Sequence, residues 1–413
     1  MHDVPVQGAV RPAVRPRGLV LVMLYVTVYL SYMHAHLQSP IISPYAASLG
    51  AGLVLTGFIV GSYSLSNIFG NLLSGYYIDT LGRKSAIMVG LALAGIAVSL
   101  YGVARTPSWL LAFRLLHGLA GGILVPATLA YIGDVSPEGQ RGKGMALYGA
   151  AIGIAAVTGP VLGGLVRGKY GFGMVFVLTL VLALVGLGTT GGFLVETLDR
   201  EAVARRPRTR STRWHLLWTA LTRRRLIAAY LLAFAIMFNK GVLAFVLPLR
   251  TESMGLSPGL TGMFFGFYGF FALLVQALPT NRISDRVGRE VPGLGGVVAM
   301  GLSLLALSLV SSTGGTFVVM ALFGLGFGIG FPAMTAIVAD ETDPEERGTA
   351  SGVFAAVYSL GVVVGPPLTA ALLRPLGPVL GDPLRTTTIV TVLVALATAA
   401  VLRRDLRTRF RRF

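Results

Sequence analysis

Twelve long apolar runs decide what this 413-residue chain can fold into. Each has about 20 residues, the length at which an α-helix crosses the hydrocarbon core of a bilayer. They lie near 19–38, 52–77, 85–104, 108–133, 144–166, 172–195, 226–249, 259–280, 291–310, 316–339, 349–373 and 386–402. Only 12% of the residues are charged, whereas a soluble domain carries about a quarter. The sequence therefore predicts an all-α polytopic membrane protein with twelve transmembrane helices.

The placement of charge orients these helices. The formal net charge is +17. Two basic residues, Arg114 and Lys240, lie inside apolar runs, and six fall on one side of the membrane, namely Arg105, Arg167, Lys169, Arg250, Arg374 and Arg385. The other lysines and arginines lie on the side that holds both termini, and such an excess marks the cytoplasmic side. We expect a multi-pass protein of the cell membrane with both termini in the cytoplasm, and the same distribution argues against nucleic acid as a partner.

The second half of the chain repeats the first with an offset of 206 residues. The offset relates Asp79 to Asp285, Gly118 to Gly324, Pro126 to Pro332, Asp134 to Asp340, Arg141 to Arg347, and Gly159-Pro160 to Gly365-Pro366. The one long polar connection, residues 196–224, is rich in arginine and separates the two copies. We predict two pseudo-symmetric six-helix bundles, residues 1–195 and 225–413, joined by a basic cytoplasmic linker, with a basic cytoplasmic tail.

The loop after the second span carries the motif Gly75-x-x-x-Asp79-x-x-Gly82-Arg83-Lys84, and Asp285, Gly288 and Arg289 repeat part of it after the eighth. With the twelve-span layout, this motif resembles the signature of the major facilitator superfamily. Arg114-x-x-x-Gly118 in span four looks like a second motif of the family. The resemblance implies transport by rocking of the two bundles about a central site.

The same resemblance implies a cytoplasmic gate. An acid after span two is held there by the arginine of the motif and by a neighbouring helix N-terminus, where guanidinium and helix dipole both stabilise a carboxylate. The gate residues are Gly75, Asp79, Gly82, Arg83, Asp134 and Arg141 in the first copy, and Asp285, Gly288, Arg289, Asp340 and Arg347 in the second. The alternative is that these charges only set the topology.

Span five contains Gly159-Pro160-x-x-Gly163-Gly164, which is similar to the signature of the proton-driven antiporters of this family, chiefly the drug-efflux branch. The second copy keeps Gly365 and Pro366. Proline inside a helix interrupts a backbone hydrogen bond, so the residues themselves predict a kink that packs span five. The meaning for antiport comes from the resemblance alone.

Polar side chains inside the spans mark the candidate transport site, because charge in a bilayer is costly and usually functional. None of the 17 acidic residues falls in the middle of a span. The candidates for substrate binding or proton coupling are His34, Gln38, Asn67, Asn71, Arg114, His117 and Lys240. His34 continues a stripe with Thr27 and Ser31, whereas His36 points elsewhere and is the better structural histidine. We expect these faces to meet in a central cavity, with satisfied structural polar groups as the alternative.

The leading functional hypothesis is a secondary active transporter that exports amphipathic organic compounds in exchange for protons by alternating access. The usual drug antiporter uses a membrane-embedded acid, which is missing here, so lysine or histidine would carry the proton. Positive groups favour organic anions, so a transporter of organic or lipid-linked anions, by symport or uncoupled, is the alternative. A non-transporting membrane receptor is a third reading, against which the gate motifs in both halves argue.

No residue pattern indicates an enzyme. The chain has no cysteine, paired catalytic carboxylates or nucleotide-binding loop, so we expect no metal and no cofactor. A stripe of Phe323, Phe327 and Phe331 in span ten is either packing or the lining of a site for apolar compounds. The expected partners are a small organic substrate, protons and the lipid bilayer, and we expect a monomer.

Overall fold

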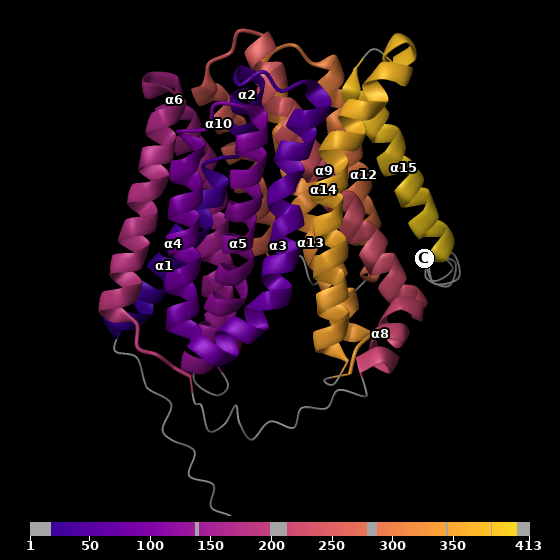
Figure 1. Ribbon diagram of the computed structural model, residues 1–413. Coiled ribbons are helices and arrows are strands. Elements are labelled where there is room, and N and C mark those ends of the chain that lie inside the picture. Colours follow the sequence, from indigo (N-terminus) through magenta and orange to yellow (C-terminus); the bar gives the residue numbers. More distant parts are fainter. Residues whose placement is uncertain are drawn as a thin grey trace, which may run out of the picture.

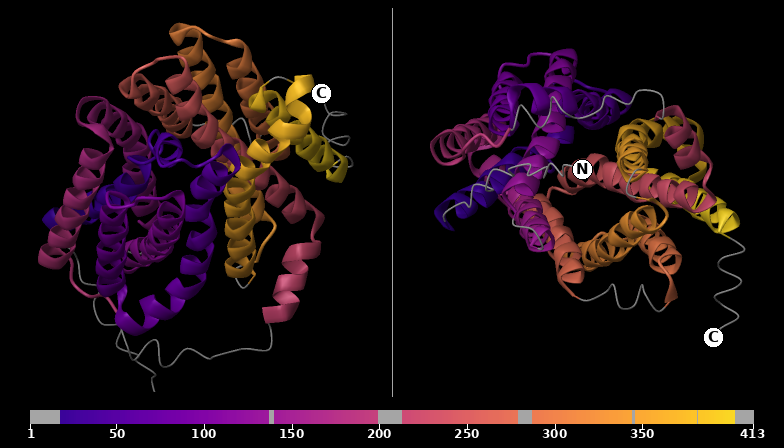
Figure 2. Two further views of the ribbon diagram at one scale, coloured as in Figure 1. Left: turned by 45° about the horizontal axis from the view of Figure 1, so that its top comes forward. Right: turned by 90° about the horizontal axis from the view of Figure 1, so that it is seen from below.

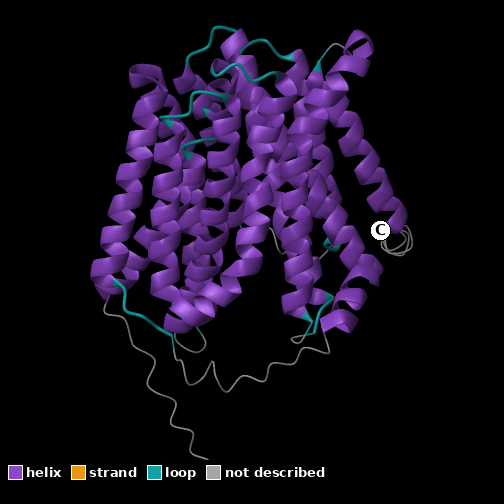
Figure 3. Ribbon diagram, viewed as in Figure 1, coloured by secondary structure: helices purple, strands orange, loops and turns teal. Residues whose placement is uncertain are grey.

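The computed structural model describes residues 18–136, 140–198, 213–278, 287–343, 346–380 and 382–402. Within these ranges every regular element is a helix, and no strand occurs (Figure 3). The helices, labelled in Figure 1, are α1 (Gly18–His36), α2 (Ile42–Ser48), α3 (Leu53–Leu81), α4 (Arg83–Tyr101), α5 (Pro107–Val135), α6 (Arg141–Phe193), α8 (Arg213–Thr222), α9 (Arg224–Ser253), α10 (Pro258–Ala277), α12 (Glu290–Leu309), α13 (Thr313–Asp340), α14 (Arg347–Leu380) and α15 (Pro383–Val401).

Ten of the described helices are long and apolar enough to cross a membrane. Helix α6 supplies two crossings, because Gly171 has a φ of 80° that breaks its helical path. A single helix of its 53 residues would be about 80 Å long, far more than a bilayer requires. With α6 counted twice and α15 as the last span, the described helices give the twelve crossings that the sequence predicts.

Short connections turn the chain back at the end of the molecule where α3 begins and α9 ends. We call this the far end, and the opposite one, where α3 ends and α9 begins, the linker end. Three helices start at the far end with a capping hydroxyl: Thr106 accepts from the N–H of Trp109, Ser257 from Leu260 and Ser312 from Gly315. Such caps satisfy N–H groups that a helix start leaves without partners.

The helices form two bundles that lie side by side (Figure 2). Glycines bring neighbouring backbones into contact inside each bundle. A Cβ on Gly118 of α5 would lie 2.1 Å from the carbonyl oxygen of Tyr63 on α3, and one on Gly296 of α12 would lie 2.5 Å from that of Gly326 on α13. In lipid, where apolar burial gives helices little reason to associate, this close approach supplies the attraction.

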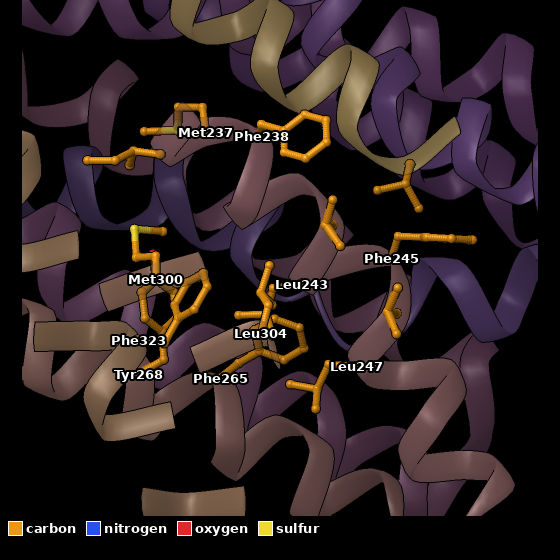
Figure 4. Close-up of a cluster of buried hydrophobic side chains, with 14 of the residues drawn as sticks. Met237, Phe238, Leu243, Phe245, Leu247, Phe265, Tyr268, Met300, Leu304 and Phe323 are labelled. Atoms are coloured by element: carbon orange, nitrogen blue, oxygen red, sulfur yellow. The ribbon is translucent and has the colours of Figure 1, made fainter. Parts of the chain in front are cut away.

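Large apolar side chains fill the second bundle around these contacts. Phe245, Phe264 and Phe323 are almost completely buried, and Figure 4 shows Tyr268, Met300 and Phe323 gathered in one cluster. The rings of Tyr268 and Phe323 meet edge to face at 5.3 Å between centroids. The polar residues of this bundle are therefore surrounded by closely packed apolar side chains.

Two helix pairs join the bundles, and the sequence repeat relates them. Helix α3 packs on α14, and α6 packs on α10. A Cβ on Gly57 would lie 2.8 Å from the backbone of Pro366, and one on Gly262 would lie 2.3 Å from the carbonyl oxygen of Pro160. Both contacts lie toward the far end. The backbones of the two bundles therefore touch at two places there, between α3 and α14 and between α6 and α10.

The bundles separate toward the linker end. A Cβ on Gly75 would meet no atom within 4 Å, and Leu72 and Tyr76 are 75% and 71% exposed. Figure 1 shows α3 and α14 close together near the top and apart near the bottom. The structure is therefore closed at the far end and open at the linker end.

Part of the predicted linker is helical. Helix α8 lies within residues 196–224, where the sequence indicated a basic connection, and Trp218 on it is 70% exposed. Helix α8 packs against α9 and α14. This helix could not be predicted from the sequence, because the many arginines of residues 196–224 leave no long apolar run there.

Adding one methyl group should separate helices that meet through backbone atoms. We expect Gly118→Ala to lower the melting temperature of the purified protein by several degrees, because overpacking costs about 1–3 kcal/mol. Thermal unfolding monitored by size-exclusion chromatography measures it. Gly149→Ala is the control, since a Cβ there meets no atom within 4 Å and alanine favours the helix. Equal melting temperatures for the two variants would contradict the packing argument.

Candidate transport site

Two histidines and a tyrosine form a buried hydrogen-bonded chain in the first bundle. His34 Nδ1 on α1 lies 2.7 Å from His117 Nε2 on α5, and His117 Nδ1 lies 2.8 Å from the hydroxyl of Tyr101 on α4. All three side chains are at most 2% exposed. The sequence proposed His34 and His117 separately, and the structure brings them into direct contact. Tyr101 was missed, because a tyrosine at the end of an apolar span is a common feature of interfaces.

Arg114 lies next to this chain. Its guanidinium donates to the carbonyl oxygens of Ile59 and Val60 on α3, at 3.2 and 3.1 Å, and lies 5.3 Å from the ring centroid of Tyr63. Tyr63 in turn meets the His117 ring edge to face. Carbonyl groups carry no net charge, so these contacts hold Arg114 in place, and no described carboxylate pairs with its positive charge.

The polar stripe of α1 faces its own bundle. Thr27 lies 3.2 Å from the hydroxyl of Thr189, and Gln38, just beyond α1, donates to the hydroxyl of Thr179 at 3.2 Å. His34 continues this face toward His117. The sequence placed the stripe toward the centre between the halves. Helical periodicity specifies which residues share a face but not which neighbour the face meets, and here hydroxyls on α6 are the partners of Thr27 and Gln38.

Asn67 and Asn71 lie on the seam between α3 and α5. The Asn71 amide donates to the Asn67 side-chain oxygen at 2.8 Å, and the Asn67 amide donates to the carbonyl of Gly118 at 3.4 Å. Both side chains are partly exposed. Their described contacts connect the two helices on which Arg114 and its carbonyl partners lie.

Lys240 lies apart from the histidine chain, midway along α9 of the second bundle. Its ammonium group is 5.6 Å from the ring centroid of Phe327 on α13. His36 is partly exposed and His34 is buried.

The first copy of the predicted gate forms a network at the linker end. Arg83 Nε lies 3.0 Å from Asp134 Oδ2, and the Arg83 guanidinium is 3.8 Å from Asp79. Gly82 has a φ of 102°, a backbone conformation that favours glycine. Asp79 is largely exposed, as its place beside the separated α3 and α14 implies. The side chain of Arg141 lies outside the described residues.

Glu196 belongs to this network and was not among the predicted gate residues. Its carboxylate accepts from the N–H of Arg83 at 2.7 Å and from the N–H of Ser85 at 3.3 Å, so it caps the start of α4. A side chain on Gly82 would collide with it, because a Cβ there would lie 2.2 Å from Glu196 Oε2. The sequence did contain one indication of this role: Glu196 is an acidic residue directly after span six, on the side of the membrane that is rich in arginine.

The second copy of the gate differs in its partners. Arg289 pairs with Asp340, as Arg83 does with Asp134, and Gly288 repeats the positive φ of Gly82. Asp285 lies outside the described residues. Arg347 donates to the carbonyls of Ala339 and Thr342 at the end of α13. Glu290, which replaces the Lys84 of the first copy, is buried and pairs with Arg225 at the start of α9.

The glycine and proline motif of span five touches two helices at once. A Cβ on Gly159 would lie 2.6 Å from His36 Cβ, and one on Gly163 would lie 2.3 Å from the carbonyl of Leu37, so both meet the end of α1. Gly164 instead faces Pro258 and Gly262 of α10 in the other bundle. In the second copy, Gly365 meets Phe238 of α9 while Pro366 meets Gly57 of α3. Each copy thus links one helix of its own bundle to one of the other.

A family model joins these observations. The model of the Major Facilitator Superfamily matches residues 24–366 and 230–410, which together cover both bundles and the linker. The chain belongs to the major facilitator superfamily. Its members are transporters, so the two bundles, the linker-end network and the paired glycine contacts are parts of a transporter and not of an enzyme.

Relatives within the superfamily share most of its length. Multidrug resistance protein 2 of Bacillus subtilis is 23% identical over 371 residues, which cover 88% of this chain and 90% of the relative. The class C tetracycline resistance protein of Escherichia coli is 28% identical over 76% of this chain and 79% of its own. A solved bacterial homologue of the human lysosomal transporter Spinster, in an inward-facing and unoccupied conformation, superposes with a TM-score of 0.75 at 16% identity over 95% of this chain and 97% of that one.

An ion pair joins the bundles of this superfamily member at the far end. Arg167 on α6 lies 2.8 Å from Glu252 at the end of α9, and its guanidinium also stacks 4.4 Å from the ring centroid of Phe172. The Arg167 side chain is 9% exposed and that of Glu252 is 53% exposed. The pair holds together the end at which the glycine contacts close the molecule.

Loss of this ion pair should favour a state that opens at the far end. We expect Arg167→Gln to raise the population of that state up to about fivefold, since an ion pair with one exposed partner contributes up to about 1 kcal/mol. Because the chain has no cysteine, spin labels at Val103→Cys and Ser311→Cys, which lie at the far end of different bundles, report the distance between them. An unchanged distance distribution in Arg167→Gln would show that the pair has no such effect. Arg105→Gln is the control for loss of one positive charge at this end.

Proposed function

We propose that this member of the superfamily exports amphipathic organic compounds in exchange for protons, by alternating access and with both termini in the cytoplasm. The observation that carries the proposal is the chain of His34, His117 and Tyr101, which can hold a proton inside the membrane. The names of the multidrug and tetracycline resistance relatives support export as the direction. In this orientation the far end faces outward, and the structure is open to the cytoplasm.

The histidine chain keeps all its hydrogen bonds when it takes up a proton. In the neutral chain, His117 donates through one ring nitrogen and accepts through the other. A protonated His117 donates through both, to Nδ1 of His34 and to the hydroxyl oxygen of Tyr101. No partner has to move more than a hydrogen atom. Histidine is also the side chain whose ordinary titration falls closest to physiological pH.

Rocking of the bundles would change which side of the membrane supplies this proton. The three partners lie on α1, α4 and α5 of one bundle, so the chain travels as a unit while the contacts at α3–α14 and α6–α10 open and close. The proton can drive the cycle if its affinity differs between the two states. One charge that crosses 100 mV supplies about 2.3 kcal/mol.

Transport of organic anions, by symport or without coupling, is the second candidate. The observation that favours it is the absence of carboxylates from the middle of the spans, since the acidic residues of the sequence all fall near span ends or outside the spans. Arg114 and Lys240 then leave a positive interior. In exchange, protons move opposite to the substrate; in symport they move with it, and in uncoupled transport they do not move.

Proteoliposomes with an acidic lumen and a trapped pH indicator distinguish them. Under exchange, adding a transported compound outside should raise the luminal pH, because protons leave as the compound enters. A panel of amphipathic dyes of both charges serves as the source of substrates. Uptake that instead requires an acidic exterior identifies symport, and uptake without any pH change identifies uncoupled transport. Either result would overturn the proposed exchange.

Replacement of the central histidine tests the proton's location. We expect His117→Gln to abolish the luminal pH change, because glutamine binds no proton at neutral pH, while exchange of labelled for unlabelled substrate continues. Retention of substrate exchange shows that the variant is folded. A variant that still moves protons at the wild-type rate would exclude the histidine chain from coupling.

A further inference from the structure

Lys240 is a cation that nothing in the described part of the chain neutralises. Its ammonium group makes no hydrogen bond and no ion pair with a described residue, and its described neighbour is the face of Phe327. A ring face attracts a cation within about 6 Å but does not replace the hydrogen bonds that an ammonium group makes in water. The side chain therefore has unused donors in the interior of the protein.

No carboxylate in the described part of the chain forms an ion pair with Lys240. Arg114, the other cation inside a span, is bound by carbonyl oxygens that carry no net charge. The described acidic residues lie at or beyond helix ends, and several of them pair with arginines, as Glu290 does with Arg225 and Asp134 with Arg83. An uncompensated charge in a low-dielectric interior is costly. A negative group supplied from outside the chain would remove that cost.

Aromatic rings continue from Lys240 across the second bundle. Phe327 and Phe331 stack with an angle of 9° between their planes and 5.4 Å between centroids. Phe331 then meets Phe354, and Phe354 meets Tyr358, at 6.4 and 5.8 Å. The four residues come from α13 and α14 and form a row that we call the aromatic row. The two rings nearest the ammonium group are parallel, and the next two are tilted by 56° and 61° between successive planes.

Several side chains along this row are partly exposed although they lie within spans. They are Lys240, Phe327, Phe331 and Tyr358 of the second bundle, and Tyr63 of the first bundle has the same property. The aromatic row therefore keeps apolar surface beside Lys240 that a bound compound can cover, and in this fold the substrate site lies between the two halves.

We propose that the transported compound is an aromatic anion, with its acidic group paired to Lys240 and its ring system stacked on Phe327 and Phe331. This proposal rests on the proposed function in one respect, namely that the chain transports an organic compound. It assigns the substrate charge opposite to that of a lipophilic cation, which the positive interior repels. The hydrophobic row accepts the apolar part of the molecule, and stacking of ring on ring adds to burial.

Calorimetric titration of the full-length protein in detergent tests the proposal with three matched probes. These are 1-naphthoate, its cationic counterpart 1-naphthylmethylammonium, and decalin-carboxylate as a saturated anion of similar size. We expect the wild type to bind naphthoate more tightly than either of the others. Tighter binding of the naphthylmethylammonium ion, equal binding of decalin-carboxylate, or no binding of naphthoate would each overturn the proposal.

Substitutions locate the site. Lys240→Gln should raise the Kd for naphthoate about 10- to 100-fold, the range for loss of a charged hydrogen bond, while Lys240→Arg stays close to wild type. Phe331→Leu should raise it about 2- to 10-fold. Lys143→Gln at the exposed start of α6 and Phe270→Leu, whose ring is 49% exposed, are controls that should leave it unchanged. An unchanged Kd in Lys240→Gln would overturn the assignment of the site.

The binding experiment and the transport experiment fail independently. Titration uses no proton gradient, so naphthoate binding that depends on Lys240 supports the substrate class even if proteoliposomes show no proton exchange. Conversely, proton exchange driven by lipophilic cations, with naphthoate unbound, would keep the proposed function and eliminate the aromatic anion. The two outcomes therefore identify which of the two proposals is at fault.

Discussion

Backbone-to-backbone packing through glycine is the constraint on which the rest of this structure depends. In a bilayer, apolar side chains gain little by leaving lipid for protein, so helices must approach closely to attract one another. Gly118 gives that approach within the first bundle, and Gly57 and Gly164 give it between the bundles. Contacts of this kind lack large interlocking side chains. They hold one end of the molecule closed without preventing the two bundles from rocking apart.

The sequence repeat explains why the closed end is symmetric. Helices α3 and α10 occupy equivalent places in the two copies, and so do α6 and α14, so the interface consists of the same kind of contact made twice. The interior has no such symmetry. The first bundle holds the histidine chain and Arg114, while the second holds Lys240 and the aromatic row. Duplication has preserved the scaffold and divided the polar functions between the halves.

Much of the fold could be predicted from the sequence, because apolar runs and a repeat are properties of single segments. Arg83 and Asp134 were both named as gate residues from the family resemblance, and the structure pairs them. Contacts that depend on the rotation of a helix were beyond reach. His34 faces His117 and not Lys240, and Glu196 caps α4 from a distant stretch of chain. His34, His117 and Glu196 are not repeated in the other half of the chain, so the repeat gives no guide to their partners.

The central claim is that the far-end contact between α6 and α10 opens in every transport cycle. A Cβ on Gly168 would lie 4.0 Å from Cβ of Pro258, which is within the range that a disulfide spans. Because the chain has no cysteine of its own, the double variant Gly168→Cys with Pro258→Cys can be cross-linked cleanly and compared with each single variant. The account predicts that oxidation stops substrate transport in proteoliposomes and that a reductant restores it. Full transport by the cross-linked protein would contradict it.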